Sequence, residues 1–459
     1  MGNTLDLETR SNLTKSQFLF YIAQKLQPDL PFFNMASLYL IAGEIQVNAF
    51  RQAFQTLINS SDALRTVFWE EEWCPQQTVL ARLDYELEYI DLSNYPDPIL
   101  KVREWARHRC RIRLPLDKHA FDSALLKISE EKYAWYFNCH QVISDAWMSA
   151  LVYQRMAELY RLAVMGRCPT AIKLPSFQEY GERERQYRRS DRYQKTEAYW
   201  KRKLSSDFQP LVLYGRSLQR VTTRVERTSC VLGRERTKRL ETLAARKDLV
   251  KTTSAPIFSI MAATLMAFLY EASGNPRISI GIPFHNRRSK VERETIGLLM
   301  DVFPLRLEID STETAQTLMN RIATEIFEIA CRGAYAVSNP FRKRTYHVLL
   351  NYHIESVPPF DGAEVTTEWI HTGSGYEPLT VQVHDFEGRG NLTVDFDCDS
   401  EIFDEELRGR IAGHFLHVLD AFLEDCRRPI ESIRLSPQET KRLTMVNFNE
   451  PDTNSHFDL

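Results

Sequence analysis

The side chains best suited to chemistry lie together in one stretch of ten residues, Asn138 to Trp147 (NCHQVISDAW). They supply a thiol, an imidazole, a carboxamide, a hydroxyl and a carboxylate, from Cys139, His140, Gln141, Ser144 and Asp145 in that order. An imidazole can act as a base in acyl transfer, and a thiolate can act as a nucleophile. A single histidine is more often structural than catalytic, so the secondary structure around the stretch is needed to choose between these two roles.

That setting is predicted to be a strand, a short loop and a helix. The aromatic run from Tyr133 to Cys139 (YAWYFNC) is typical of a buried strand, and a helix is expected from about Asp145 to Leu162. We expect Ser144 to cap the helix, because a serine hydroxyl can accept a bond from a main-chain N–H of the first turn. His140 and Gln141 would then lie beside the partly positive start of the helix.

Cys139 has two interpretations. Beside His140 it could be a nucleophile that forms a covalent acyl-enzyme. We favour a small core residue of the strand, because a free cysteine behaves as a small hydrophobic side chain and is commonly buried.

Around this stretch the chain consists of two mixed segments joined by a charged one, so we predict an α/β fold with two lobes. The predicted parts are a first lobe at 1–176, a charged linker at 177–218, a second lobe at 219–435 and a polar tail at 436–459. Mixed charges without proline at 177–203 indicate a solvated linking helix. Ligand sites occur preferentially between such lobes.

Spacing of apolar residues places the other elements that carry the site. Strands are expected at Met35–Ile41, Arg277–Ile282 and Tyr346–His353. One helix is expected to begin near Leu13–Gln17, a second to include Val47 to Leu57, and a third to include Leu407 to Phe422. The uncharged stretch Ser254–Tyr270 is shorter than the ~20 residues that cross a bilayer. We therefore predict a helix buried in the core of a soluble protein, with Thr253 or Ser254 as its cap.

Composition excludes several function classes. The 459 residues include Lys+Arg 58 and Asp+Glu 61, for a net charge of −3, which offers no general attraction for nucleic acid or a membrane surface. The 8 cysteines form no CxxC pair, so we predict a reduced, cytoplasmic compartment. No phosphate-binding loop, dinucleotide fingerprint or HExxH pattern occurs, so we predict no metal and no bound cofactor.

The segment HQVISDAW resembles the HHxxxDG signature of the condensation domains of nonribosomal peptide synthetases, whose common form is HHIISDGW. Six further segments are similar to family elements in the same order. They are Leu13–Gln17 (LTxxQ), Ser61–Phe68 (HEALRTxF), Phe177–Tyr180 (YxDY), Gly281–Arg287 (GTPVAGR), Ile296–Arg306 (IGFFVNTLPLR) and Ile411–Phe415 (LAGHF). The resemblance covers nearly the whole chain.

The resemblance implies a concrete fold and activity. Family members fold as two chloramphenicol-acetyltransferase-like lobes in a V with a central tunnel. Upstream and downstream carrier proteins dock at its two mouths and extend phosphopantetheine arms toward the motif. An acceptor amine attacks the donor thioester there, and the second histidine of the motif is placed at the reacting centre. The arms belong to the carriers, so the domain itself binds no cofactor.

The chain departs from the motif at one residue. Alignment on Ser144–Trp147 puts His140 on the first histidine and Gln141 on the second. Pairing Cys139 and His140 with the two histidines instead would lengthen the spacing to Asp145 and break the match to SDGW. Glutamine cannot serve as a general base near neutral pH, but it can donate and accept hydrogen bonds.

The resemblance also assigns supporting residues. The aspartate of the family motif typically pairs with an arginine of the HEALRT segment, so we expect Asp145 to pair with Arg65, and Arg287 is the next candidate. Ala146 replaces the glycine of the motif, a mild change because helices tolerate alanine. Asp301 is a secondary candidate.

Three other histidines and the tail complete the predictions. His285, His347 and His353 lie in segments that the family brings near the junction, and we interpret them as structural. The tail from Leu435 resembles the linker into an adenylation domain, which suggests a piece of a larger synthetase. The short segment before Leu13 suggests a start near the natural N-terminus, with a donor from a separate protein or a starter acyl group.

The sequence supports two functions and a variant of the first. The first is a condensation-class acyltransferase that forms an amide or ester, with Gln141 positioning the nucleophile and His140 holding the loop. The second is a degraded condensation-like domain that docks carriers or partner enzymes. The variant is a changed reaction, in which the substrate supplies the base or His140 swings into that role.

Overall fold

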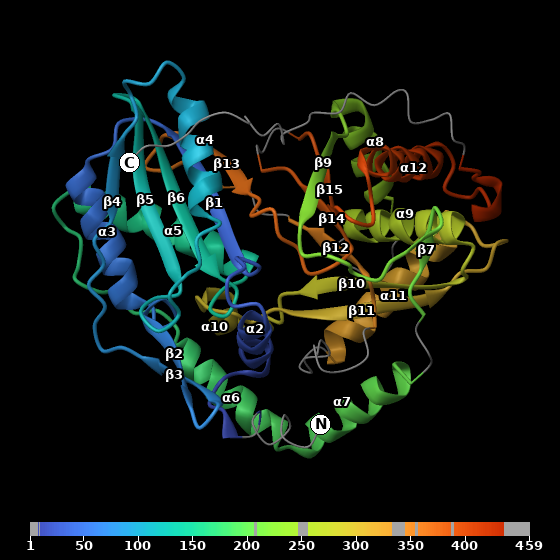
Figure 1. Ribbon diagram of the computed structural model, residues 1–459, viewed down its shortest axis with the longest axis horizontal. Coiled ribbons are helices and arrows are strands. Elements are labelled where there is room, and N and C mark those ends of the chain that lie inside the picture. The colour runs from blue at the N-terminus through green and yellow to red at the C-terminus, as the bar shows by residue number, and fades with distance from the viewer. Residues whose placement is uncertain are drawn as a thin grey trace.

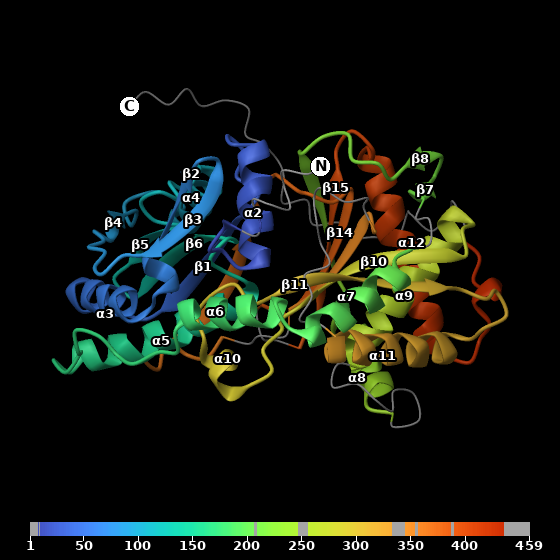
Figure 2. The ribbon, with the colours of Figure 1, turned by 90° about the horizontal axis from the view of Figure 1, so that it is seen from below.

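The computed structural model describes residues 8, 10–205, 209–246, 256–332, 345–353, 357–386 and 390–435. Within these residues the chain folds into two α/β lobes that lie side by side, each built on one large sheet (Figure 1). Helices α6 (Phe177–Arg188) and α7 (Asp191–Lys203) connect the lobes along one side of the molecule (Figure 2). The predicted α/β fold with two lobes is confirmed.

The first lobe contains a five-stranded sheet in the order β13-β1-β6-β5-β4 and a small hairpin, β2-β3. Its strands are β1 Asn34–Ala42, β2 Thr66–Glu71, β3 Cys74–Val79, β4 Glu88–Asp91, β5 Phe121–Ser129, β6 Lys132–His140 and β13 Glu364–Ile370. Its helices are α2 Lys15–Leu26, α3 Val47–Ser60, η1 Ala63–Arg65, α4 Pro98–Arg109 and α5 Ala146–Val164. The elements predicted around 35–41, 47–57, 133–139 and 145–162 are confirmed.

Strand β6 divides the first lobe into two cores, because successive residues of a strand point to opposite faces. Trp135 and Phe137 pack with α3 and α5 on one face. Tyr136 packs with α4 on the other. The strand ends at His140, so the main chain that leads into this residue is held in a packed sheet.

The second lobe contains a six-stranded sheet in the order β11-β10-β12-β14-β15-β9 and a small pair, β7-β8. Its strands are β7 Val212–Leu213, β8 Arg216–Ser217, β9 Val225–Val231, β10 Arg277–Phe284, β11 Asp301–Glu308, β12 Val348–Tyr352, β14 Leu379–His384 and β15 Thr393–Asp399. Its helices are α8 Arg234–Ala244, α9 Pro256–Ser273, α10 Lys290–Glu294, α11 Ala315–Arg332, α12 Glu405–Glu424 and η2 Ile430–Ser432.

Helix α9 is the long apolar helix that the sequence predicts to be buried. Its mean hydropathy of 1.4 and its 18 residues meet the length and composition test for a membrane span, but 61% of it is buried inside the lobe. Its side chains form the centre of the second core together with those of α11 and α12. The burial confirms the prediction, and the predicted caps, Thr253 and Ser254, lie outside the described residues.

The charged segment predicted as one linking helix forms two helices. Ser190 lies between them, and its hydroxyl accepts the N–H of Tyr193 at 3.3 Å, which starts α7 as a separate helix. Trp200 of α7 is fully buried in the second core, so the end of the linker is anchored in that lobe.

One strand of the second half of the chain belongs to the first sheet. Strand β13 pairs antiparallel with β1, from Ala36 opposite Ile370 to Ala42 opposite Glu364. The segment after it returns to the second lobe, where the carbonyl of Gly373 accepts the N–H of Val225 at 3.1 Å. The predicted segment 219–435 therefore completes both sheets, and the tail from 436 lies outside the described residues.

Candidate active site

The predicted strand–loop–helix setting of the motif is confirmed. Strand β6 ends at His140, and Gln141 to Ser144 form a tight turn before α5. The N–H of Ser144 donates to the carbonyl of Gln141 at 3.2 Å. The N–H of Gln141 donates to the carbonyl of Phe33 at 2.8 Å, which ties the turn to the segment before β1. Main-chain bonds on both sides thus fix the position of Gln141.

The cap of α5 is Asp145, and the prediction of Ser144 is wrong. The Oδ1 atom of Asp145 accepts the N–H of Met148 at 2.8 Å. The hydroxyl of Ser144 donates instead to the carbonyl of His140 at 2.9 Å. Ser144 is used inside the turn, so the next residue with a side-chain acceptor caps the helix, and Ala146 is its first residue.

His140 is buried, and both of its ring nitrogens are engaged. Its Nδ1 atom accepts the N–H of Val142 at 3.0 Å, and its Nε2 atom lies 3.1 Å from Oε1 of Gln24. The amide NH₂ of Gln24 donates to the carbonyls of Gln27 and Leu30, so the oxygen of the amide faces the ring. These partners assign the proton to Nε2.

The same burial sets the charge of His140. Burial lowers the pKa of the imidazole to about 3, so the ring is neutral at physiological pH. A neutral ring whose only lone pair accepts a main-chain N–H has no site left for a substrate proton. In this geometry His140 closes the turn and is not a general base.

Gln141 is half-buried, and its side chain differs from its neighbours in having no partner. Its carboxamide makes no hydrogen bond with any residue that the structure describes. A carboxamide can donate two hydrogen bonds and accept two. It is therefore available to bind a substrate.

Asp145 pairs with Arg287 of the second lobe, and the predicted pair with Arg65 is not formed. The guanidinium contacts both carboxylate oxygens, at 2.7 and 3.0 Å, and the exposed fractions of the two side chains are 0% and 3%. The N–H groups of Leu299 and Met300 also donate to Asp145, at 3.0 and 3.1 Å.

Arg65 is the last residue of the 3₁₀ helix η1, and its contacts lie away from Asp145. Its side chain donates to the carbonyls of Leu80 and Ala81 at the end of β3, so it supports the hairpin of the first lobe. Both arginines fit the spacing of the motif segments, and only the packing of the lobes selects Arg287.

The loop that presents these N–H groups to Asp145 depends on Gly297. Its φ of +156° lies in the region that favours glycine, and a Cβ atom there would collide with the ring of Phe177. The carbonyl of Gly297 also accepts a hydrogen bond from Arg287 at 2.9 Å. A glycine is required for this close approach.

The other predicted residues are close to the motif or buried, but they have structural partners. Burial raises the pKa of the Cys139 thiol to about 12, which favours the structural interpretation over a nucleophile. His285 stacks on Phe284 and accepts the N–H of Arg287 at its Nδ1 atom, at 3.0 Å. Asp301, the first residue of β11, accepts the N–H of Val302.

The remaining two histidines lie in the second lobe. His353 is buried edge-on against Trp369, with ring centres 4.6 Å apart, and burial lowers its pKa to about 3. His347 is also buried. Among the described residues, no group of three or more His, Cys, Asp or Glu is arranged to hold a metal ion.

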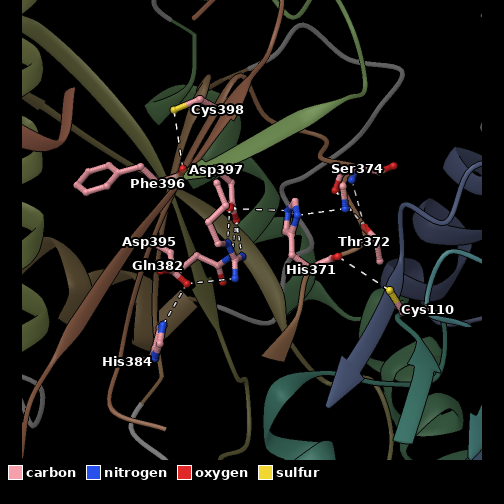
Figure 3. Close-up of polar contacts among 12 residues, drawn as sticks. Cys110, His371, Thr372, Ser374, Gln382, His384, Asp395, Phe396, Asp397 and Cys398 are labelled. Carbon is pink, nitrogen blue, oxygen red and sulfur yellow. Dashed lines mark hydrogen bonds and ion pairs between the residues drawn. The ribbon is translucent and has the colours of Figure 1, made fainter. Parts of the chain in front are cut away.

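The sequence reasoning missed a buried polar cluster on the sheet of the second lobe (Figure 3). Arg227 donates to both oxygens of Asp397, at 2.6 and 2.8 Å, and lies 3.1 Å from Asp395. His384 points to Asp395, and His371, which directly follows β13, points to Asp397. The cluster therefore attaches the crossover segment to the second lobe.

The charges of this cluster support one another. Burial opposes ionisation of Asp395 and Asp397, but the charge of Arg227, together with hydrogen bonds and the neighbouring histidines, outweighs it and lowers their pKa values. Asp395, Asp397 and Asp399 alternate along β15, a period of two that places three carboxylates on one face of the strand. That alternation is the sequence pattern from which the buried cluster could have been predicted.

Comparison with known proteins decides the family. The family model for the condensation domain matches residues 8–444 of the chain. The chain belongs to the condensation-domain family. Among its relatives, this condensation domain is 24% identical over 417 residues to the dimodular nonribosomal peptide synthase of Bacillus subtilis (strain 168). It is 27% identical over 421 residues to the isonitrile lipopeptide synthase of Streptomyces coeruleorubidus.

The domain covers only part of these relatives. Each alignment includes 88% of this chain, but 17% of the first relative and 28% of the second. Its fold matches the starter condensation domain of rhizomide synthetase RzmA with a TM-score of 0.82, 23% identity and coverage of 92% of this chain and 97% of the other. The first condensation domain of the calcium-dependent antibiotic synthetase matches with a TM-score of 0.79, 22% identity and coverage of 92% and 98%.

Membership gives the site its chemical class. Condensation domains are acyltransferases that form the peptide bond between substrates tethered to phosphopantetheine. In this condensation domain, the motif loop lies where the two lobes meet, because Asp145 of the first lobe and Arg287 of the second are in direct contact.

Proposed function

We propose that this domain joins a donor acyl group to an acceptor, each carried on the phosphopantetheine arm of a carrier protein, by amide or ester formation. The observation that carries the proposal is the motif turn, held by Asp145 and Arg287 at the junction of the lobes, with one unengaged polar side chain, that of Gln141. For an amine acceptor, its nitrogen attacks the thioester carbonyl. The C–N bond forms, the C–S bond breaks, and the pantetheine thiol leaves.

Gln141 takes the place of the second histidine of the family motif in this proposal. The carboxamide would orient the amine or the thioester carbonyl without taking a proton. General-base catalysis is typically worth ~10²–10⁴-fold. Orientation of two bound reactants can contribute as much or more. A slower reaction that relies on positioning is therefore physically reasonable.

The proton balance follows from the state of His140. Because both of its nitrogens are occupied, the proton lost by the amine goes to water or to the leaving thiolate. The rate should then follow the fraction of acceptor amine that is already neutral. His140, Ser144 and the Asp145–Arg287 pair hold the turn, and Ala146 starts the helix.

The wider organisation remains part of the proposal. The lobes would comprise 1–176 and 219–435, with 177–218 as linker and strand β13 completing the first sheet. A tunnel between the lobes would admit the two arms. Residues 436–459 would lead to an adenylation domain of a longer synthetase in the cytoplasm, with partners on both sides being carrier proteins and neither nucleic acid nor membrane.

A reconstituted reaction tests the proposal. Both carriers are loaded with labelled substrates, and product is measured with the native domain and with the Gln141→Ala and Gln141→His variants. Product above the rate without enzyme, lost in Gln141→Ala, supports positioning by the carboxamide. Native product formation no faster than the uncatalysed rate, with all loadings confirmed, would reject the reaction.

A second function is favoured by one observation: the motif turn contains no imidazole nitrogen that can accept a proton. The domain would then dock carriers or a partner enzyme without chemistry. Activity that appears only in Gln141→His, together with native binding of loaded carriers in a titration, supports docking. An undiminished rate in a folded His140→Ala variant eliminates the reaction in which His140 swings in as the base.

A further inference from the structure

We propose that Gln24 is a positioning residue of the active site, which acts through His140 to hold the turn that presents Gln141. Gln24 lies in α2, more than a hundred residues before the motif, and no family segment identified in the sequence includes it. The proposal deepens the proposed function and rests on it for its turnover measurement.

The first observation is the orientation of the Gln24 side chain. Its NH₂ group donates to the carbonyls of Gln27 and Leu30, at 2.9 and 3.0 Å. Both donors of the amide are therefore used in the turn that ends α2. The oxygen is left to face His140 at 3.1 Å, so it can only accept.

The second observation is what this acceptor does to the ring. An acceptor at Nε2 keeps the proton on that nitrogen and leaves the lone pair on Nδ1. That lone pair receives the N–H of Val142, at 3.0 Å, which is one of the two side-chain bonds inside the motif turn. If the proton moved to Nδ1, two donors would face each other and this bond of the turn would be lost.

The third observation is that Gln24, His140 and Phe33 form one packed group, and this group holds Gln141 from both sides. The ring of Phe33 packs edge-on against His140, with centres 5.7 Å apart, and its carbonyl accepts the N–H of Gln141. Gln24 and His140 have exposed fractions of only 8% and 2%, so water does not replace these bonds. The bond from Gln24 is thus one of the contacts that locate the carboxamide.

Two substitutions separate positioning from simple filling of space. Both substitutions, Gln24→Met and Gln24→Glu, remove the two donors to the carbonyls of Gln27 and Leu30, so that loss is common to them. Gln24→Met keeps the length of the side chain but removes the acceptor, so Nε2–H loses its partner. Gln24→Glu keeps an acceptor and adds a negative charge, which stabilises the doubly protonated ring. The protonated Nδ1 would then repel the N–H of Val142. Gln27→Met is the matched control, because the side chain of Gln27 is exposed and makes no hydrogen bond with the described residues.

Turnover with loaded carriers should fall tenfold or more in Gln24→Met, since misplacement of reacting groups by about 1 Å can cost about 10²-fold. In Gln24→Glu the rate, divided by the native rate at the same pH, should be low near pH 6 and recover as the pH rises and the ring loses its second proton. The control should stay within about twofold of the native rate. Equal rates in all variants, or a pH-independent loss in Gln24→Glu, would overturn the proposal.

Nuclear magnetic resonance of ¹⁵N-labelled histidine rings gives a second readout that needs no turnover. The His140 signals, assigned by their loss in His140→Gln, should show a proton on Nε2 and no titration between about pH 5 and 8. Gln24→Glu should introduce a titration in that range. A native ring with its proton on Nδ1 would refute the proposal even in a domain that forms no product, so the two failures can be told apart.

Discussion

Replacing Arg287 by methionine removes one partner of the buried ion pair that joins the two lobes. The exposed fractions of the Arg287 and Asp145 side chains are 0% and 3%, so solvent cannot substitute for either charge. Removing one member of such a pair typically costs ~3–5 kcal/mol, mostly because the other charge is left buried. Methionine retains much of the volume of the arginine stem, so a cavity adds little.

The remaining contacts of Asp145 place the expected loss at the lower end of that range. Three main-chain N–H groups, from Met148, Leu299 and Met300, still donate to the carboxylate after Arg287 is gone. Each hydrogen bond to a charged group is worth ~1.5–3 kcal/mol. We therefore expect Arg287→Met to lower the free energy of unfolding by about 3 kcal/mol.

A double-mutant cycle with Asp145→Asn isolates the interaction itself. Asp145→Asn alone leaves the guanidinium with two carbonyl partners, those of Gly297 and His285, and should also cost about 3 kcal/mol. The double variant contains neither of the two charges, so no unpaired charge stays buried. Its loss should fall short of the sum of the single losses by about 2 kcal/mol, within the range observed for residues in contact.

The assay is urea unfolding followed by tryptophan fluorescence and by circular dichroism, because a two-lobed chain need not unfold in one step. Arg236 and Asp420 provide the control: their contacts are equally short, 2.7 and 2.9 Å, but the exposed fractions are 28% and 35%. Arg236→Met should cost about 1 kcal/mol or less. A loss in Arg287→Met no larger than in the control, or a coupling below about 0.5 kcal/mol, would refute the reasoning.

Three further predictions follow from the site. Arg65→Ala should cost only about 1 kcal/mol by urea unfolding, because Arg65 donates to carbonyls at the end of β3 and not to Asp145; a loss equal to that of Arg287→Met would contradict this. Burial lowers the pKa of His140 and His353 to about 3, so below the ordinary value of about 6.5 the unfolded chain binds protons that the folded chain does not. Stability should therefore fall by about 1.4 kcal/mol per pH unit for each of the two, from about pH 6.5 downward, and His353→Gln should reduce the slope. Burial also raises the pKa of Cys139 to about 12, so iodoacetamide at pH 7.5 should label the exposed Cys331 and leave Cys139 unmodified by mass spectrometry.

The elements that position the site could be predicted because their patterns are local. The aromatic run before His140 has the composition of a buried strand, and the spacing of Val47, Phe50, Phe54 and Leu57 marks one face of a helix. Such patterns report which face is buried and not what covers it. The pairing of β13 with β1 was therefore not predictable, although both segments have strand composition.

The contacts of the site were less predictable than its elements, for a physical reason. Arg65 and Arg287 both stand in segments similar to family elements, and the choice between them depends on where a 3₁₀ turn and a loop direct two long side chains. Gln24 carried no signal at all, because a glutamine in an amphipathic helix is normally solvated. Only its burial against His140 gives it a role.

Asp145 connects the two lobes and the chemistry through one carboxylate. It caps α5, it pairs with Arg287 of the second lobe, and it accepts the N–H groups of Leu299 and Met300, so the start of the helix is tied to the segment that follows β10. The residue before it, Ser144, bonds to the carbonyl of Gln141 through its main-chain N–H. A change in the angle between the lobes would act on Asp145 first and reach Gln141 within four residues. If Gln141 positions the substrate without taking a proton, as proposed, the rate should depend strongly on that angle.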